Sequence, residues 1–156
     1  MRVYRITKKK YVKNFNGRGG SYEDGARWNL PGHPVLYFGT SASVAMLEMG
    51  HYIPTPKMVP KSFVLGIYDI DSTAIESVEL SELTDGWDNF PYPLATQRIG
   101  SDFLVRGDNL ILLVPSSAAA GIDKMIVVNP EHPDINKISL IETRSEIFNP
   151  RLFKGL

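Results

Sequence analysis

The chain of 156 residues contains no cysteine. Disulfide bonds, thiolate metal ligands and cysteine nucleophiles are therefore excluded together. An excess of charge of either sign is missing too, because 17 basic residues balance 17 acidic ones. A chain with no formal net charge has no overall field that would draw it to a polyanion. We therefore expect neither direct nucleic-acid binding nor attachment to a membrane surface.

Several sequence motifs that would indicate a particular function are also missing. No uninterrupted apolar stretch approaches the length that spans a bilayer, and the first residues, Met1–Arg5, lack the apolar core of a signal peptide. The histidines show no spacing typical of metal ligands, so we expect no metal. No glycine-rich phosphate loop ends in lysine, and no dinucleotide fingerprint follows a strand. These observations predict a cytoplasmic protein without a bound metal.

What is present is typical of a globular protein. Hydrophobic residues make up 43% of the chain and charged residues 22%, so we expect one domain over residues 1–156. Apolar runs bounded by turn residues predict strands at 3–6, 35–38, 63–70, 109–114, 124–128 and 137–142, whereas helices are expected over 41–51 and 94–105. Because strands and helices do not alternate regularly, the pattern favours an α+β fold over a doubly wound sheet.

The segment Arg27-Trp28-Asn29, closed by Pro31-Gly32, is the most informative part of the chain. An indole packs best when buried, a guanidinium needs an anionic or aromatic partner, and a Pro-Gly turn fixes the direction of both. The segment leads into an apolar strand that carries Tyr37 and then into a helix that carries Glu48. The sequence thus predicts a small-molecule site built from a loop, a strand and a helix.

Each of these side chains also has an ordinary structural interpretation. Arg27 would bind a phosphate or carboxylate through its planar fork, or else form a surface salt bridge. Tyr37 would stack on a flat ring, or else be a core aromatic residue with its hydroxyl satisfied. Ser116 follows a proline at a strand end, where its hydroxyl would face a ligand or simply form a turn.

Glu48 gives the sharper indication. In the expected helix, Val44, Leu47 and His51 would share one stripe, and Glu48 would border that apolar face. A carboxylate in this place costs desolvation unless it is paired or used. The alternative is a carboxylate that reaches from the margin of the stripe into solvent.

Taken in order, the segments resemble the RES domain, the toxin half of a bacterial toxin–antitoxin pair. The resemblance covers essentially the whole chain. The segments that carry it are Val-Tyr-Arg-Ile at 3–6, Phe-Asn-Gly-Arg-Gly at 15–19, Gly-Ala-Arg-Trp-Asn at 25–29 with Pro31-Gly32, Val-Leu-Tyr at 35–37, Ala-Met-Leu-Glu at 45–48 with His51, Gly86-Trp87, Ile99-Gly100 with Phe103-Leu104, Val-Pro-Ser-Ser at 114–117, Asn129-Pro130, His-Pro-Asp at 132–134 and Asn-Pro-Arg-Leu at 149–152. The Arg-Trp-Asn and Val-Pro-Ser segments are the specific ones.

The resemblance implies an ADP-ribosyltransferase-like fold, with a compact split β-sheet flanked by a few helices. It implies an enzyme that destroys NAD⁺ by breaking the nicotinamide–ribose bond, through hydrolysis or through phosphorolysis with inorganic phosphate. The family's functional residues fall here on Arg27, Tyr37, Glu48 and Ser116. We place Trp28 and Asn29, together with Arg27, Tyr37 and Ser116, among the residues that bind NAD⁺.

The resemblance also implies a partner, an Xre-like DNA-binding antitoxin whose tail fills the cleft. Two other functions remain open from the sequence. One is transfer of ADP-ribose from NAD⁺ to a protein, and the other is a non-catalytic module that binds a nucleotide.

Overall fold

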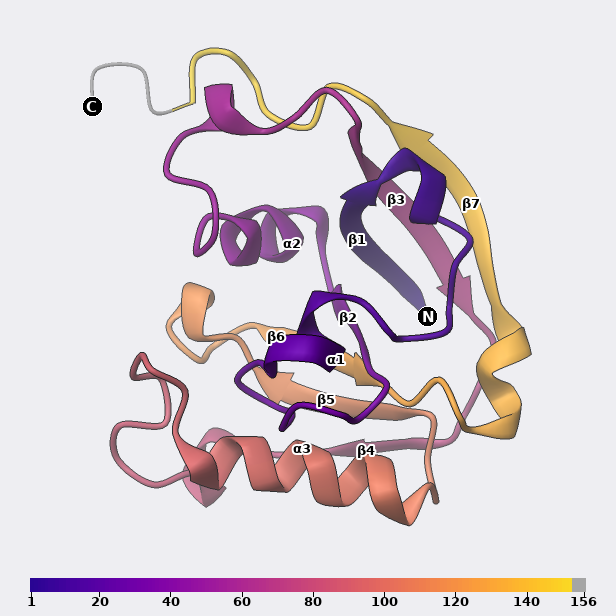
Figure 1. The fold of residues 1–156 in the computed structure, drawn as a ribbon, viewed down its shortest axis with the longest axis vertical. Helices are drawn as coiled ribbons and strands as arrows, with labels where there is room; N and C mark the ends of the chain where they lie inside the picture. The colour runs from indigo at the N-terminus through magenta and orange to yellow at the C-terminus, as the bar shows by residue number, and fades with distance from the viewer. Residues whose placement is uncertain (153–156) are drawn as a thin grey trace.

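The structure is a computed structural model and describes residues 1–152. Seven strands form one mixed sheet in the order β4-β5-β6-β2-β1-β3-β7 (Figure 1). Their bounds are β1 Arg2–Lys8, β2 Leu36–Gly39, β3 Phe63–Ile70, β4 Ile75–Ser77, β5 Ile111–Pro115, β6 Lys124–Val128 and β7 Ile138–Arg144. All pairs are antiparallel except β4 with β5, which is parallel. The expected α+β class is therefore confirmed.

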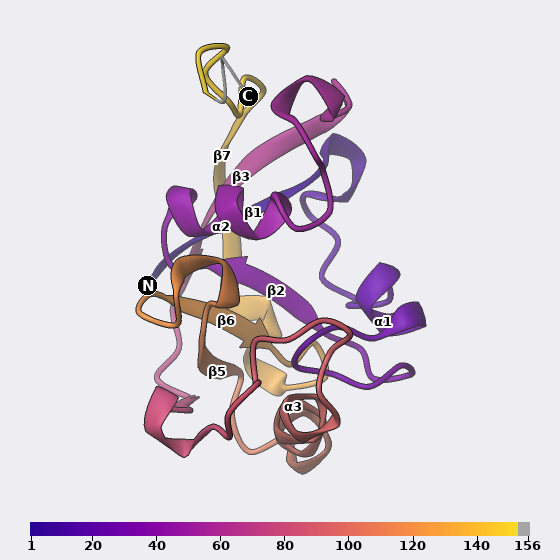
Figure 2. The same ribbon diagram turned by 90° about the vertical axis from the view of Figure 1, so that its left-hand side faces the viewer.

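Three α-helices accompany the sheet in the described part of the chain: α1 Gly20–Asp24, α2 Ala42–Met49 and α3 Leu94–Arg106. The helix α2 begins after Ser41, whose side chain accepts a hydrogen bond from the amide of Val44 at 3.1 Å. The helix α3 ends at Arg106 and is followed by Gly107, whose φ of 68° lies in the left-handed region that favours glycine after a helix end. In Figure 2, α2 lies near β1 and β2, whereas α3 lies at the β5 side of the molecule.

The sheet is divided between β1 and β2. The register of these two strands pairs a single position, Tyr4 with Gly39. By contrast, β1 pairs with β3 along its whole length, from Arg2 to Lys8. Figure 1 shows the β1–β3–β7 half and the β2–β6–β5–β4 half diverging from this junction. The split that the resemblance implied is therefore a narrow junction within one continuous sheet.

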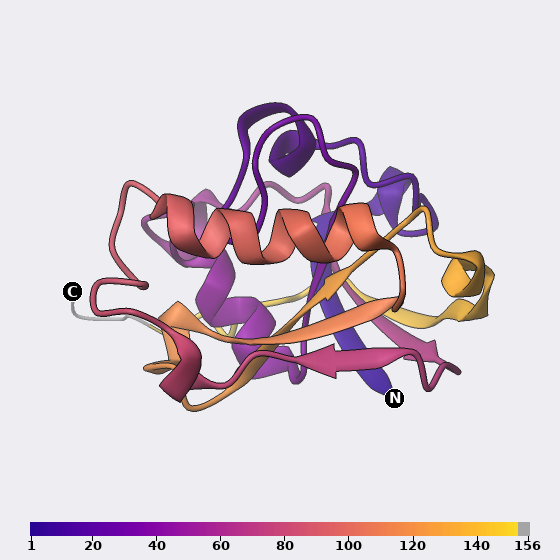
Figure 3. The same cartoon turned by 90° about the horizontal axis from the view of Figure 1, so that it is seen from below.

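Two hydrophobic clusters cover the two faces of the central strands. The strand β5 shows why, since Ile111 belongs to one cluster and Leu112 to the other. The second cluster contains Phe103 and Leu104 of α3 together with Trp28, which is 1% exposed. Figure 3 shows α3 running alongside this half of the sheet. Because both faces are covered, β5 reads in the sequence as a continuous apolar run.

The six expected strands and both expected helices are found, and the structure adds a seventh strand, the short β4. The strands expected at 3–6, 35–38, 63–70, 109–114, 124–128 and 137–142 correspond to β1, β2, β3, β5, β6 and β7, and the expected helices correspond to α2 and α3. The glycine-rich segment 11–25 contains the short helix α1, which was not among the expected helices. The expected stripe of α2 was wrong, because Leu47 is 48% exposed and His51 is exposed. The helix instead buries Val44 and Ala45, so Glu48 lies on the inward side.

Candidate active site

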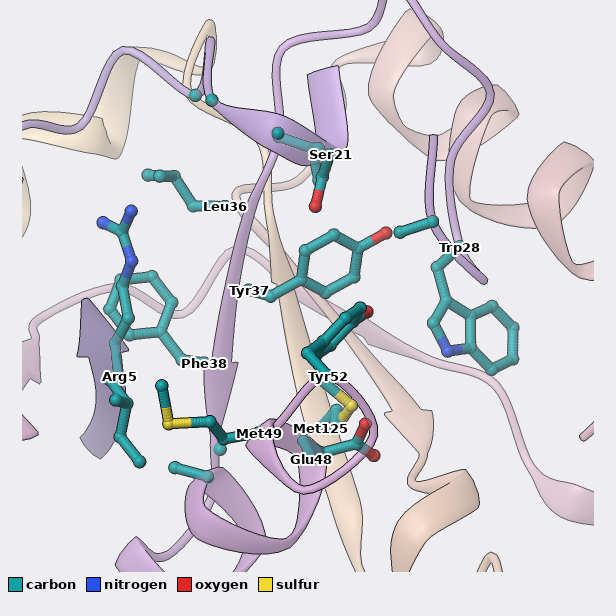
Figure 4. Close-up of a pocket in the computed structure, with 18 of the residues that line it drawn as sticks. Arg5, Ser21, Trp28, Leu36, Tyr37, Phe38, Glu48, Met49, Tyr52 and Met125 are labelled. Carbon is teal, nitrogen blue, oxygen red and sulfur yellow. The ribbon is translucent and has the colours of Figure 1, made fainter. Parts of the chain in front are cut away.

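A cavity of about 810 Å³ opens where β1 and β2 separate. This volume lies within the range of about 300–1,000 Å³ that is typical of small-molecule sites. The middle of β1, the glycine-rich segment with α1, β2, α2 and the turn after α2 all contribute to its wall. Figure 4 shows Tyr37, Tyr52 and Glu48 projecting into one part of it, with Arg5 beside Phe38 on one side and Trp28 on the other.

Glu48 presents its carboxylate to this cavity from α2, and its side chain is 16% exposed. Its Oε1 atom accepts a hydrogen bond of 2.6 Å from the hydroxyl of Ser116. Its Oε2 atom lies 3.6 Å from Nδ1 of His51, three residues further along the chain. The carboxylate is therefore held in one orientation rather than reaching into solvent, which decides between the two interpretations of Glu48.

Ser116 holds the carboxylate of Glu48 through a hydrogen bond. The residue is fully buried, and its Oγ atom accepts a hydrogen bond of 3.2 Å from the amide of Ala119 while donating to Glu48. The neighbouring Ser117 lines the cavity, whereas Ser116 is not among the lining residues. This differs from the expectation that the Ser116 hydroxyl faces the ligand. The strand end at Pro115 places that hydroxyl against Glu48 instead.

Tyr37 and Asn29 form a second such pair. The Tyr37 hydroxyl donates a hydrogen bond of 2.6 Å to Oδ1 of Asn29, and burial raises the pKa of the Tyr37 phenol well above its usual value. Asn29 is fully buried, and its Nδ2 atom donates to the carbonyl of Ser21 at 2.7 Å and to that of Leu30 at 3.1 Å. We expected Asn29 to contact the dinucleotide. The structure instead places its side chain against the Tyr37 hydroxyl, and Asn29 is not among the residues that line the cavity.

Arg27 also lines the cavity and is held by the loop 85–93. Its NH1 group donates to the carbonyl of Trp87 at 2.7 Å and to that of Asn89 at 2.9 Å. The guanidinium also lies over the ring of Tyr92, 5.3 Å from its centroid. Within residues 1–152, no carboxylate pairs with Arg27, so the interpretation of Arg27 as part of a surface salt bridge fails. In the same range, the NH2 and Nε groups of Arg27 have no protein acceptor.

The loop that carries Arg27 is fixed by α3. Trp28 is buried in the core at the edge of the cavity, and its ring centroid lies 6.3 Å from that of Trp87. The hydroxyl of Ser101 in α3 accepts a hydrogen bond of 2.9 Å from the amide of Leu30. A Cβ atom at Gly100 would collide with the carbonyl oxygen of Trp28, so α3 approaches the loop as closely as glycine allows. Among residues 1–152, the indole Nε1 of Trp28 has no hydrogen-bond partner.

The structure adds an arginine that the sequence reasoning did not select. Arg5, in the middle of β1, lines the cavity and lies 5.9 Å from the centroid of the Phe38 ring. Burial lowers the pKa of Arg5, and its guanidinium donates a hydrogen bond of 3.4 Å to the carbonyl of Asn14. In the described part of the chain no carboxylate pairs with it. A charged residue inside the short apolar run Val-Tyr-Arg-Ile was the available signal.

Two tyrosines that the sequence reasoning also missed meet at the cavity. The hydroxyls of Tyr52 and Tyr92 lie 3.2 Å apart, and burial raises the pKa of Tyr52. Tyr52 follows α2, and Tyr92 comes from the loop that holds Arg27, so the contact joins two segments 40 positions apart. Both residues are in irregular segments, so no periodicity could have identified them.

This site is equipped for a polar ligand that contains flat rings and anionic groups. It combines the fixed carboxylate of Glu48, several aromatic rings and three arginines, Arg5, Arg18 and Arg27, that no carboxylate neutralises within residues 1–152. In that same range, no group of three or more histidine, aspartate or glutamate residues is arranged to hold a metal ion. None of the described helices is both long enough and apolar enough to cross a membrane.

Known proteins resemble the chain along nearly its whole length. A protein named "Toxin Res" from Yersinia enterocolitica is 30% identical over 153 residues, which cover 97% of this chain and 99% of that protein. Another "Toxin Res", from Pseudomonas putida, is 32% identical over 143 residues, or 90% of this chain and 93% of that protein. A "Prs ADP-ribosylating toxin" from Sphingobium is 25% identical over 138 residues, with 86% and 84% covered.

Solved structures show the same fold. The crystal structure of the Mycobacterium tuberculosis MbcT–MbcA toxin–antitoxin complex contains a chain that matches with a TM-score of 0.69. The match covers 92% of this chain and 82% of that chain at 20% identity, so it supports the fold alone. The family model described as the RES domain matches residues 2–148. With a match of that extent, the chain belongs to the RES domain family.

Proposed function

We propose that this chain is the toxin of a toxin–antitoxin pair and that it degrades NAD⁺ by cleaving the nicotinamide–ribose bond. The observation that carries the proposal is that Glu48, Tyr37 and Arg27, which come from a helix, a strand and a loop, line one cavity. The names of the Res relatives support the toxin role. The cleavage reaction is our inference from the chemistry of the cavity.

Cleavage needs a group that stabilises positive charge on the ribose. As the bond between the ribose carbon and the nicotinamide nitrogen breaks, its electron pair leaves with neutral nicotinamide and the ribose becomes cation-like. A fixed carboxylate beside that carbon stabilises the developing charge, and the Ser116 hydrogen bond keeps Glu48 in place for this task. A water or phosphate oxygen then bonds to the ribose carbon. With water as acceptor, its released proton passes to Glu48 or to solvent.

The remaining residues bind the rest of the dinucleotide. The Tyr37 ring offers a flat wall for the nicotinamide, because its hydroxyl is already used by Asn29. The free donors of Arg27 and the guanidinium of Arg5 are suited to the pyrophosphate or to an attacking inorganic phosphate. Ser116 and Asn29 act through Glu48 and Tyr37, and Trp28 holds the Arg27 loop in the core.

A second candidate is transfer of ADP-ribose to a protein. It is favoured by the relative from Sphingobium, which is named as an ADP-ribosylating toxin. The two reactions share the departure of nicotinamide and differ in the acceptor, which is water or phosphate in one and a protein side chain in the other.

Such an activity in the cytoplasm requires a partner that blocks it. The MbcT–MbcA structure is described as a toxin–antitoxin complex, which supports the proposal of an antitoxin for this chain. We propose an Xre-like DNA-binding protein in this role. The balanced charge of the present chain agrees that DNA contacts would come from the partner.

The decisive measurement is nicotinamide release from NAD⁺ by the purified protein, with and without inorganic phosphate. We expect release from the wild type and none from the Arg27→Ala variant, and dependence on phosphate would identify phosphorolysis. Label that passes from NAD⁺ to an added protein would establish ADP-ribosylation. NAD⁺ binding without release would indicate a non-catalytic module, and the absence of both would overturn the proposal.

A further inference from the structure

Asn29 occupies an unusual position among the conspicuous residues of the site. It is fully buried, and its side chain uses both of its polar atoms on partners inside the protein. Oδ1 accepts from the Tyr37 hydroxyl, and Nδ2 donates to the carbonyls of Ser21 and Leu30. Both amide protons are used inside the protein, so the side chain has no donor left for a ligand, and Asn29 is not among the residues that line the cavity.

The partners of this amide lie on different walls of the cavity. Tyr37 is on β2, whereas Ser21 is in α1 of the glycine-rich segment, and both residues line the cavity. Figure 4 shows the Ser21 side chain above the Tyr37 ring, with the Tyr37 hydroxyl directed away from β2. One side chain therefore connects two walls that belong to separate parts of the chain.

The other contacts of Asn29 show that its own backbone is fixed. Its amide and carbonyl pair with the carbonyl and amide of Ala26, at 3.4 Å and 3.0 Å. These two hydrogen bonds close the Ala26–Asn29 turn and hold the backbone from which the Asn29 side chain projects.

We propose that Asn29 is a positioning residue, which fixes the Tyr37 ring relative to the glycine-rich wall and so shapes the space that receives a flat ring. The proposal rests on the proposed function in one respect, namely that Tyr37 contacts the nicotinamide of NAD⁺. Asn29 itself does not touch the ligand. Its effect on binding passes through the Tyr37 hydroxyl, so its removal matters only while that hydroxyl is present.

A double-mutant cycle tests this coupling, with NAD⁺ affinity measured by titration calorimetry in proteins that all carry Glu48→Gln, which should bind NAD⁺ but cleave it slowly. Asn29→Ala should weaken NAD⁺ binding by roughly tenfold when Tyr37 is present, the equivalent of one hydrogen bond. In the Tyr37→Phe background the same change should cost less than about twofold. Equal losses in the two backgrounds would overturn the proposal, because they would mean that Asn29 acts independently of Tyr37.

Asn129→Ala is the matched control. Asn129 is 2% exposed, and its Nδ2 donates to the carbonyl of Leu104 at 3.2 Å, outside the residues that line the cavity. Its loss should lower the melting temperature much as Asn29→Ala does, but leave NAD⁺ affinity unchanged. A matching fall in NAD⁺ affinity for Asn129→Ala would show that general destabilisation explains both results.

If NAD⁺ does not bind at all, the proposed function is wrong. A spectroscopic measurement still tests the positioning role of Asn29 in that event. Asn29 accepts a hydrogen bond from the neutral phenol, so Asn29→Ala should lower the pH at which Tyr37 ionises. Absorbance of tyrosinate, with Tyr37→Phe as the reference, reports this ionisation. An unchanged ionisation curve would overturn the positioning role, whereas a shift would support it even if no nicotinamide is released.

Where Asn29→Ala does not fold, Asn29→Asp replaces it. The aspartate keeps an oxygen for the Tyr37 hydroxyl but loses both donors to the glycine-rich segment. We expect it to weaken NAD⁺ binding and, unlike Asn29→Ala, to raise the pH at which Tyr37 ionises, because a carboxylate beside the phenol disfavours the phenolate. Wild-type affinity in this variant would contradict the proposed link between the two walls.

Discussion

The hydroxyl of Ser116 donates a hydrogen bond of 2.6 Å to Oε1 of Glu48, although the residues are 68 positions apart in the sequence. The same oxygen of Ser116 accepts from the amide of Ala119, so the hydroxyl proton is directed at the carboxylate. A carboxylate that is restrained before the ligand arrives needs no reorganisation during the reaction. Ser116 therefore fixes the carboxylate of Glu48, to which the proposed reaction assigns the stabilisation of the ribose cation.

Replacement of Ser116 by alanine should therefore lower kcat more than it raises KM. The variant loses a hydrogen bond to a charged group, and we expect kcat for nicotinamide release to fall between about 10- and 100-fold. Ser139→Ala, at an exposed position in β7, is the control and should behave as the wild type. A Ser116→Ala enzyme with unchanged kcat would show that the orientation of Glu48 does not limit the reaction.

Glu48→Gln tests the charge of the carboxylate separately from its position. Glutamine keeps an oxygen that can accept from Ser116, so NAD⁺ should still bind. The loss of negative charge should lower the rate of nicotinamide release by about two orders of magnitude or more. Glu131→Gln, at an exposed site, is the matched control. Wild-type turnover by Glu48→Gln would remove this residue from the mechanism.

Arg27→Lys tests the contacts that join Arg27 to the loop 85–93. Lysine lacks the planar fork that donates to Trp87 and Asn89 and stacks on Tyr92. We expect faster amide hydrogen exchange in residues 85–93 and NAD⁺ affinity at least about tenfold weaker. Arg98→Lys, at an exposed position of α3, should change neither quantity. Unaltered exchange in the loop would mean that Arg27 does not hold it.

Gly100→Ala should destabilise the protein. The added Cβ would meet the backbone carbonyl of Trp28, which cannot rotate away as a side chain could. We expect the free energy of unfolding to fall by about 1–3 kcal/mol, the usual cost of overpacking, in a denaturant titration. Gly19→Ala is the control for stability, because nothing lies within 4 Å of its added Cβ. A Gly100→Ala protein of wild-type stability would show that α3 can withdraw from the loop without cost.

Alkaline pH should destabilise the fold through Tyr37. Burial raises the pKa of Tyr37 in the folded protein above its usual value of 10.0, so the folded state keeps a proton that the unfolded chain loses. The free energy of unfolding is therefore unaffected by Tyr37 ionisation below pH 10. It falls as the pH rises above 10, by up to about 1.4 kcal/mol per pH unit. Denaturant titrations of the wild type and of Tyr37→Phe test this between roughly pH 8 and pH 11, a range that spans the usual pKa of a phenol. Parallel pH curves would contradict it.

Local sequence signals were sufficient for most of the architecture. The apolar run 109–114 predicted β5 because both of its faces are covered. The hydroxyl residues Thr40 and Ser41 both predicted the start of α2, and the structure shows that Ser41 satisfies the free amide there. The helix α1 was missed because its five residues, which begin with glycine, have no apolar periodicity. The buried face of α2 was misjudged because the surroundings of the helix, and not its own spacing, determine which side meets the sheet.

The amino-acid sequence by itself determined which chemical groups the site contains, since the Arg-Trp-Asn segment, Tyr37 and Glu48 stand out by residue type and local setting. The tertiary structure alone decided how they are used. It turned Ser116 and Asn29 away from the cavity, added Arg5, and joined Tyr52 to Tyr92. The physical reason is that hydrogen bonds between distant segments depend on how strands and loops are brought together, and no local pattern encodes that distance or direction.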